Sequence, residues 1–395
     1  MATVLYLAHR LPYPPDKGDK VRTHHILRHL AARHRVVLAT FIDDPADLAG
    51  REQLARWCDR LFAVRLRPLW ARLRALTGLL RGEALTLAYY RDRRMRAWVT
   101  ALRRGGTIDA VVVSSSSMAP YAAGFDVPIV MDFIDVDSAK WATYADQSTW
   151  PGSWIYAREA QLLSRFEQEM AARASQVFFV TGRELALFQS RALTSLTPAD
   201  VLGNGVDTDY FAPDPQRPSP FDEGELPLVF TGTMNYRPNI DAMCWFVRDV
   251  LPLLRQQWPA LRLSIVGRHP VAEVRALAGN GVRVTGMVAD VRPWLQHAAV
   301  VVAPLRIVRG LPNKILEAMA MGRPVVAARA CAEALDVLPE IDLEVATEAA
   351  QYLQKITALL TDPERCRQLG ESARVRMQGH YSWQTQLAPL SQTLD

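Results

Sequence analysis

The stretch "GLPNKILEAMAMGRPVVA", Gly310–Ala327, follows a run of valines and combines a helix start, a helix stop and a second strand. Pro312 suits the first turn of a helix, and Gly322 is typical of a position just past a helix end. Lys314 and Glu317 should then share one face in the first two turns of that helix. The stretch therefore predicts a strand, helix and strand in succession, the repeating unit of a parallel sheet.

The same alternation is found along the whole chain: short runs of Val, Ile and Leu alternate with longer amphipathic segments. This pattern predicts an α/β fold with parallel strands and crossover helices, including helices over Val21–Ala32 and near Ala139–Arg173. The predicted strands are Val4–Ala8, Val36–Phe41, Leu61–Leu66, Ala110–Ser114, Pro128–Phe133, Gln176–Val180, Leu228–Gly232, Leu263–Gly267, Val282–Gly286, Ala299–Leu305 and Arg323–Ala328.

The length of the chain and one proline-rich segment predict two domains. At about 150 residues per domain, 395 residues correspond to two or three domains, of which we take two. The segment "FAPDPQRPSPFDEGELP", Phe211–Pro227, interrupts the α/β rhythm, because proline at this density resists both helix and central strand. We expect it to mark the junction, and we expect a ligand cleft between the two domains.

Three predicted strands of the second half end in glycine, at Gly232, Gly267 and Gly286. In open parallel sheets, ligands bind outside the carboxyl ends of the strands, where a Cβ would block close approach of the backbone. A single glycine here would be an ordinary turn residue. Three of them in one half-chain favour a binding edge.

Composition argues against a disordered chain, a metal- or disulfide-based framework and a membrane-spanning protein. Lys and Arg number 46 against 41 Asp and Glu, and 49% of the residues are hydrophobic, as in a globular protein. The four cysteines lie far apart and do not have the spacing of metal ligands, so neither a zinc site nor a disulfide framework is expected. No signal peptide or run of about 18 to 20 apolar residues is evident, which predicts a cytoplasmic or peripherally attached protein.

Basic charge is concentrated in Arg65–Arg104, which holds eleven arginines interleaved with leucines. Such a stretch is typical of a solvated helix whose leucines face the core. It is equally typical of a surface that contacts an anionic membrane or a phosphorylated substrate.

The order of Lys314 and Glu317 indicates a ligand rather than a stabilising pair. An exposed pair contributes only ~0.2 to 0.5 kcal/mol, the order Lys before Glu is the less favourable one, and a lysine at a helix start opposes the helix dipole. An anion at the helix N-terminus would explain the lysine. A carboxylate one turn further suits the vicinal hydroxyls of a ribose, and phosphate with ribose indicates a nucleotide.

Several motifs resemble known glycosyltransferases. Gly310–Ala327, "GNGVDTDYFAP" (Gly203–Pro213) and "FTGTMNYRPNIDAMCWFVRDVLP" (Phe230–Pro252) resemble family-4 glycosyltransferases of the GT-B architecture. More narrowly, "LPYPPDKGDKVRTHHILRHLA" (Leu11–Ala31) and "VMDFIDVDSAKWATYA" (Val130–Ala145) resemble the sugar transferases of the exosortase and PEP-CTERM exopolysaccharide system.

The resemblance implies two Rossmann-like domains that face a central cleft. Residues 1–205, with a crossover helix at 382–395, would bind the acceptor, and residues 206–381 would bind the nucleotide sugar. It also implies a UDP or GDP sugar donor, a lipid-linked or polysaccharide acceptor, transfer with retention of configuration, and no metal or other cofactor. The enzyme would act at the cytoplasmic face of the membrane, and no nucleic acid is expected as a partner.

The resemblance also assigns residues. Glu317 would hold the ribose and Lys314 would approach the phosphates or the sugar. The base would be lined by Gly286, Met287 and Val288. Further donor contacts are expected from Gly18, Lys17, Gly232, Thr233, Arg237, Arg306, Gly310 and Leu311.

Three departures from the family pattern concern the site. Arg309 stands eight positions before Glu317, where the family has a glutamate that contacts the sugar. The usual arginine and lysine after the first strand of the donor domain are replaced by "GTMNYRPN", which leaves Arg237 or Arg306 as substitutes. A frequent mid-domain histidine is replaced by Asp132 or Asp135, and we take Asp135 as a catalytic candidate.

Alternatives remain open at this point. A catalytically silent scaffold that binds a nucleotide sugar, or a nucleotide-sugar epimerase of the same architecture, would share these features. A nicotinamide dehydrogenase is disfavoured because neither Val4–Ala8 nor Leu228–Gly232 leads into G-x-G-x-x-G. The Asp-x-Asp triplets at Asp135–Asp137 and Asp207–Asp209 resemble a metal signature, but such triplets arise by chance in a chain with 41 acidic residues.

Overall fold

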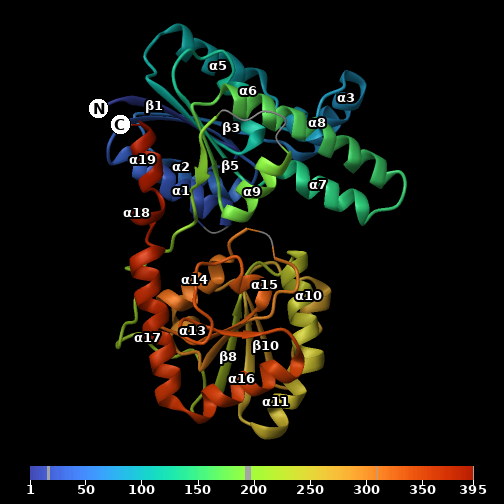
Figure 1. The fold of residues 1–395 in the computed structure, drawn as a ribbon, viewed down its shortest axis with the longest axis vertical. Coiled ribbons are helices and arrows are strands. Elements are labelled where there is room, and N and C mark those ends of the chain that lie inside the picture. The colour runs from blue at the N-terminus through green and yellow to red at the C-terminus, as the bar shows by residue number, and fades with distance from the viewer. Residues whose placement is uncertain (16–17, 192–196, 309, 395) are drawn as a thin grey trace. The chain divides into compact units, whose positions relative to one another are not determined.

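The computed structural model describes residues 1–15, 18–191, 197–308 and 310–394. The chain divides into two compact units. Unit 1 comprises Met1–Gly203 and Leu387–Asp395, and unit 2 comprises Asn204–Gln386. Each unit has its own parallel sheet with helices on both faces (Figure 1), so the α/β fold that the sequence predicts is confirmed.

Within the described residues, unit 1 holds a seven-stranded parallel sheet in the order β3-β2-β1-β4-β5-β6-β7. Its strands are β1 (Thr3–Ala8), β2 (Arg35–Ile42), β3 (Arg60–Arg65), β4 (Ala110–Ser114), β5 (Ile129–Ile134), β6 (Gln176–Phe179) and β7 (Ala199–Val201). Its helices are α1 (Gly18–Ala31), η1 (Pro45–Gly50), α2 (Arg51–Leu54), α3 (Pro68–Arg81), α4 (Leu85–Tyr89), α5 (Arg93–Arg104), η2 (Ser116–Met118), α6 (Ala119–Ala122), α7 (Asp137–Asp146), α8 (Gly152–Arg173), α9 (Gly182–Arg191) and α19 (Ala388–Leu394).

The described part of unit 2 holds a six-stranded parallel sheet in the order β10-β9-β8-β11-β12-β13. Its strands are β8 (Leu226–Thr231), β9 (Leu261–Val266), β10 (Val282–Gly286), β11 (Val300–Ala303), β12 (Val325–Ala328) and β13 (Glu344–Ala346). Its helices are α10 (Arg237–Trp245), the π-helical turn η3 (Phe246–Val250), α11 (Leu251–Gln257), α12 (Ala272–Arg275), α13 (Arg292–Gln296), α14 (Asn313–Ala320), α15 (Arg329–Ala332), α16 (Ala349–Thr361), α17 (Pro363–His380) and α18 (Trp383–Gln386).

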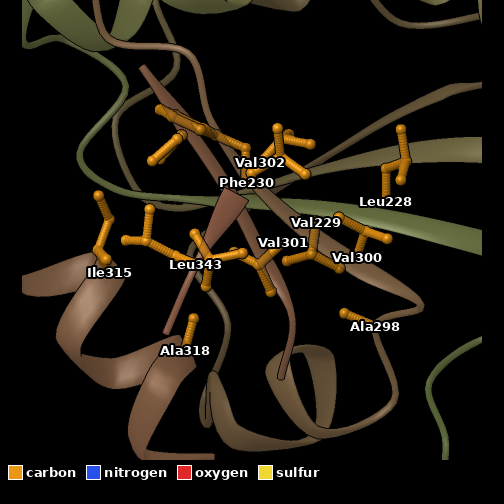
Figure 2. Packing of buried hydrophobic residues seen from close by; sticks show 14 of the residues in the cluster. Leu228, Val229, Phe230, Ala298, Val300, Val301, Val302, Ile315, Ala318 and Leu343 are labelled. Carbon is orange, nitrogen blue, oxygen red and sulfur yellow. The ribbon is translucent and has the colours of Figure 1, made fainter. Parts of the chain in front are cut away.

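Both sheets are buried on both faces, which explains why their strands are continuous apolar runs rather than alternating ones. In β1, residues Val4 to Ala8 are all fully buried. In unit 2, Val300, Val301 and Val302 are buried in succession. Figure 2 shows Val300 to Val302 packed beside Leu228 to Phe230, the neighbouring strand of the same sheet. These central strands fix the positions of the loops that follow them.

Three details differ from the sequence predictions. The helix expected near Ala139–Arg173 is two helices, α7 and α8, which are separated by residues 147–151 with Pro151 directly before α8. The single crossover helix expected at 382–395 is also two, α18 and α19, with Pro389 in the first turn of the second, where proline is tolerated. The proline-rich segment Phe211–Pro227 lies within unit 2, where Asp214 donates its backbone N–H to Gln296 Oε1 at 2.9 Å.

Candidate functional site

The helix that the sequence predicts after the valine strand is α14, which begins at Asn313, directly after Pro312. Ile315, Leu316, Ala318, Met319 and Ala320 are fully buried. Figure 2 shows Ile315 and Ala318 on the side of α14 that faces the sheet. Lys314 and Glu317 belong to the opposite, half-buried side of the helix. Packing of the apolar side therefore holds both charged residues at the start of α14.

Lys314 is held by uncharged partners. Its Nζ donates a hydrogen bond to Asn239 Oδ1 at 2.7 Å and lies 3.8 Å from the centroid of the Phe230 ring. No carboxylate within the described ranges forms an ion pair with it, and this includes Glu317. Burial lowers the pKa of Lys314 to about 7, with smaller opposing effects of Cys331 and Glu317. Asn239 therefore fixes the position of the ammonium, and among the described residues no carboxylate pairs with its charge.

Asn239 is a site residue that sequence reasoning missed. It is buried on α10, and its Nδ2 donates to the backbone oxygen of Thr233 at 2.9 Å, which turns Oδ1 toward Lys314. The loop after β8 is thereby linked to the start of α14. A polar residue on the buried side of a helix was the one sequence signal available for it.

The three glycines at the strand ends lie next to one another. The backbone N–H of Gly232 donates to Val266 O at 3.0 Å, and that of Gly267 donates to Gly286 O at 3.1 Å. A Cβ on Gly232 would lie 2.8 Å from both Lys314 Nζ and Asn239 Nδ2. A Cβ on Gly267 would lie 1.6 Å from Gly232 O. Glycine is required here because side-chain amines and neighbouring backbone occupy the space.

Glu317 lies one turn beyond Lys314 on α14. Burial raises its pKa to about 7, and the charge of Lys314 opposes this shift. Among the described residues its carboxylate has no ion-pair partner. Burial raises the pKa of Tyr210, and the negative charge of Glu317 adds to this rise. The guanidinium carbon of Arg292 lies 4.1 Å from the centroid of the Tyr210 ring. The carboxylate is therefore available for a polar ligand.

Other predicted donor residues differ in their surroundings. Arg306 forms an ion pair with Asp241, with Nε 2.9 Å from Oδ2, and stacks on Trp245 at 5.7 Å. Arg237 begins α10 and is exposed. Neither arginine forms a hydrogen bond with Asn239 among the described residues, and the partner of Lys314 is the Asn239 amide oxygen.

The remaining predicted residues have different positions and surroundings. Thr233 supplies its carbonyl to Asn239, while Gly286 and Gly310 have φ of 70° and 63°. Met287 is 80% exposed beside the sheet edge, whereas Val288 and Leu311 pack against the core. Gly18 is the first residue of α1 in unit 1. Lys17 and Arg309 lie outside the described residues.

The two candidate aspartates of unit 1 have different roles. Asp132 is buried in a bidentate pair with Arg22, whose Nε and Nη2 lie 2.8 and 2.7 Å from its two oxygens. Asp135 follows Ile134, which has φ of 71°, and its Oδ1 has no hydrogen-bond partner among the described residues. Burial, together with Glu184 and Asp137, raises the pKa of Asp135 to about 6. Asp132 is thus paired with Arg22, whereas Asp135 has a buried carboxylate oxygen without a hydrogen-bond partner among the described residues.

Neither the Asp207–Asp209 triplet nor the two hollows of unit 2 include a predicted site residue, whereas the Asp135–Asp137 triplet contains Asp135. Asp207 caps a turn by accepting the backbone N–H of Tyr210 at 2.9 Å. In the described parts of the chain no three His, Cys, Asp or Glu residues are grouped to hold a metal ion. Surface hollows of about 400 and 600 Å³ in unit 2 are lined by Asp222, Arg262 and Arg283 and by Leu251, Arg255 and Asn280, all away from Lys314.

Two Rossmann-like units with these sheets define the GT-B fold, which several solved structures share. Anabaena HepE in complex with UDP superimposes with a TM-score of 0.70 at 16% identity over 100% of this chain and 99% of that one. Sucrose-phosphate synthase from Thermosynechococcus elongatus gives 0.71 at 17% identity over 100% and 98%. WaaG, a glycosyltransferase of lipopolysaccharide biosynthesis, gives 0.65 at 18% identity over 99% and 98%.

Residues 225–362, which lie within unit 2, match the family model described as "Glycosyl transferases group 1". A curated relative is the GDP-mannose-dependent alpha-(1-6)-phosphatidylinositol monomannoside mannosyltransferase of Mycolicibacterium smegmatis. It is 32% identical over 230 residues, a match that covers 52% of this chain and 59% of the relative. The chain thus aligns with little more than half of that relative's length.

Proposed function

We propose that this protein is a glycosyltransferase that moves a sugar from a nucleotide diphosphate donor to an acceptor hydroxyl. The observation that carries the proposal is the Lys314 ammonium, held by Asn239 at the glycine-lined edge of β8 to β10, with Glu317 one turn away. The match to group 1 glycosyl transferases covers these residues. HepE structures that contain UDP and UDP-glucose support a nucleotide-sugar donor.

Each residue has a role in this proposal. Lys314 and the first N–H groups of α14 stabilise the diphosphate as negative charge develops on it. Glu317 accepts hydrogen bonds from the ribose hydroxyls. The absence of a side chain at Gly232 lets Lys314 Nζ and Asn239 Nδ2 lie close to the backbone at the end of β8. Gly286, Met287 and Val288 contact the base, and Asp135 contacts the acceptor.

The reaction needs no protein nucleophile. The bond between the anomeric carbon and the phosphate oxygen breaks, and a bond forms between that carbon and the acceptor oxygen on the same face. The departing phosphate oxygen takes the acceptor proton, so atoms and charge balance without a metal or cofactor. Charge stabilisation of the leaving group is then the main task of the site.

The donor nucleotide is either UDP or GDP in this proposal. HepE structures contain UDP, whereas the mannosyltransferase relative is described as GDP-mannose-dependent. The exposed Met287 beside Gly286 is the side chain best placed to contribute to base choice.

We further propose an acceptor of exopolysaccharide biosynthesis, lipid-linked or glycan, used at the cytoplasmic face of a membrane. The α3 apolar face supports membrane contact. We define it as Leu69, Trp70, Leu73, Leu76 and Leu80, which are 54 to 92% exposed. The arginine-rich stretch can be interpreted either as a solvated helix with core-facing leucines or as a contact surface. The apolar side chains of α3 do not face the core, which favours the contact surface. In the part of the chain that the structure describes, no helix is long and apolar enough to cross a membrane.

A donor panel tests the proposal. The purified protein is incubated with UDP and GDP sugars, with and without membrane extract as a source of acceptor. Release of nucleoside diphosphate that depends on the extract, and that Lys314→Ala abolishes, is the expected result. Formation of a free epimer, or binding without turnover, would instead indicate an epimerase or a scaffold and would contradict the proposal.

A further inference from the structure

A hollow of about 200 Å³ in unit 1 is lined by none of the predicted site residues. Its apolar walls include Leu87, Pro120 and Phe166, and its charged rim includes Arg91 and Arg96. Pockets that enclose whole small molecules are larger, about 300 Å³ or more. The hollow therefore has room for one end of a ligand, with the remainder outside.

The hollow lies at a favoured position of the sheet. Ser117, part of its lining, belongs to η2, which follows the end of β4. Tyr90, also part of the lining, packs its ring against His9, which follows β1, with ring centroids 6.2 Å apart. β1 and β4 are neighbours at the point where the strand order reverses. In open α/β sheets, ligands bind outside the strand ends at this topological switch point.

The charge of the rim favours an anion. Arg91 is paired with Glu83, so this pair carries no net charge. The hydroxyl of Tyr121 is also occupied, since it donates to Tyr90 O at 2.6 Å and accepts from Asp92 N at 2.8 Å. Arg96, by contrast, is exposed and has no carboxylate partner within the described ranges. A guanidinium of this kind is suited to hydrogen-bond a phosphate group.

The surroundings of the hollow favour a long apolar chain on the same ligand. Glu83, in its lining, lies two residues beyond the end of α3. Arg158 of α8 donates to the backbone oxygens of Gly78 and Glu83 at 3.1 Å each, which fixes the end of α3 against α8 (Figure 1). Phe166 lies eight residues further along α8, about 12 Å away. Leu80, the last residue of the α3 apolar face, thus precedes the hollow-lining Glu83 by only three positions in the chain.

We infer that the hollow binds the phosphate group and first carbons of a long-chain lipid phosphate, whose chain continues toward the α3 apolar face. Arg96 binds the phosphate, and Leu87, Pro120 and Phe166 contact the adjoining hydrocarbon. This inference rests on the proposed function, because such a lipid would carry the acceptor. It selects a lipid-linked acceptor over a free polysaccharide.

Isothermal titration of the full chain with decyl phosphate, below its micelle concentration, tests the inference. The wild-type protein should bind decyl phosphate, and should bind decanol and inorganic phosphate at least about tenfold more weakly, because each retains only half of the contacts. Inorganic phosphate that binds as tightly as decyl phosphate would show a simple anion site and overturn the inference.

Variants separate the hollow from nonspecific adsorption. Arg96→Gln and Leu87→Ala should each weaken decyl phosphate binding about tenfold or less, whereas Arg93→Gln, on the same helix but outside the lining, should not. All variants are first compared by their unfolding midpoints. Equal affinity of Arg96→Gln and Arg93→Gln for decyl phosphate contradicts the inference.

The wild-type protein is titrated with UDP and GDP in the same series. Binding of one nucleotide without binding of decyl phosphate would overturn this inference and leave the proposed function intact. Binding of decyl phosphate without either nucleotide would overturn the proposed function instead.

Discussion

The Lys314 ammonium lies 2.7 Å from the amide oxygen of Asn239, and the two residues come from different crossovers of the same sheet. The amide fixes the ammonium without neutralising it. Asn239→Ala removes this acceptor and lets the lysine side chain move, so nucleoside diphosphate affinity should fall about tenfold. Calorimetric titration measures the effect. Asn239→Asp should also weaken binding, because a carboxylate competes with the phosphates for Lys314; unchanged affinity in both variants would contradict this role.

The affinity for nucleoside diphosphate should depend on pH. Burial lowers the pKa of Lys314 to about 7, so the ammonium loses its proton as the pH rises through that value. Phosphate groups with a second pKa near 6 are already ionised at this pH, so the fall in affinity reflects deprotonation of the protein and not of the nucleotide. Affinity should fall by up to about one decade per pH unit between about pH 7 and pH 9. Lys314→Ala should bind weakly and should lack this decline, because the other group of the site with a pKa of about 7, Glu317, becomes a better hydrogen-bond acceptor for the ribose as it ionises.

Gly232→Ala should impair binding more than folding. The added Cβ would lie 2.8 Å from both Lys314 Nζ and Asn239 Nδ2, and these side chains would have to move apart. We expect loss of the nucleotide-induced thermal shift, together with a lower unfolding midpoint because φ of 151° at Gly232 strains a side chain. Gly279→Ala is the matched control in unit 2 for the strain, since Gly279 has φ of 106° and its Cβ would meet nothing within 4 Å. Retained nucleotide binding in Gly232→Ala would argue against a site at this edge.

The buried pair of Arg22 and Asp132 should be important for the stability of unit 1. Asp132→Ala leaves the guanidinium buried without its partner, which costs ~3 to 5 kcal/mol of unfolding free energy. Asp59→Ala, which removes the exposed partner of Arg35, should cost less than ~1 kcal/mol. Urea unfolding of the two variants compares the costs, and similar values for both would contradict this assignment.

Glu167 should make stability depend on pH. Burial raises the pKa of its carboxyl group to about 8, although hydrogen bonds from Ser138 oppose the shift. The folded state therefore binds a proton that the unfolded state releases near pH 4.5, and stability falls as the pH rises from about 4.5 to 8. Glu167→Gln should be neutral at pH 4, below both pKa values, and should stabilise the protein by about 1 kcal/mol or more at pH 9. Unfolding curves at both pH values measure this difference.

The fold could be predicted because its signals are local. Buried parallel strands are continuous apolar runs, and β4 and β10 have the bounds that the sequence suggested. β13 was missed because it contains the charged Glu344, which is buried between Lys355 and Arg365. Its partners lie 11 and 21 residues away, and no local pattern reveals them.

The candidate site was only partly predictable for the same reason. The position of Lys314 and Glu317 at the start of a helix follows from Pro312 and the apolar residues around them. The hydrogen bond to Asn239 joins residues 75 positions apart and depends on the order of the strands. The exposure of the α3 apolar face likewise depends on which side of the helix packs inward.

The most direct test of the proposed donor site is a crystal structure of the protein with UDP or GDP. We predict a phosphate oxygen about 2.7 to 3.2 Å from Lys314 Nζ, and ribose hydroxyls at the same distance from the Glu317 carboxylate. A nucleotide bound elsewhere, with Lys314 still bonded only to Asn239, would contradict the account.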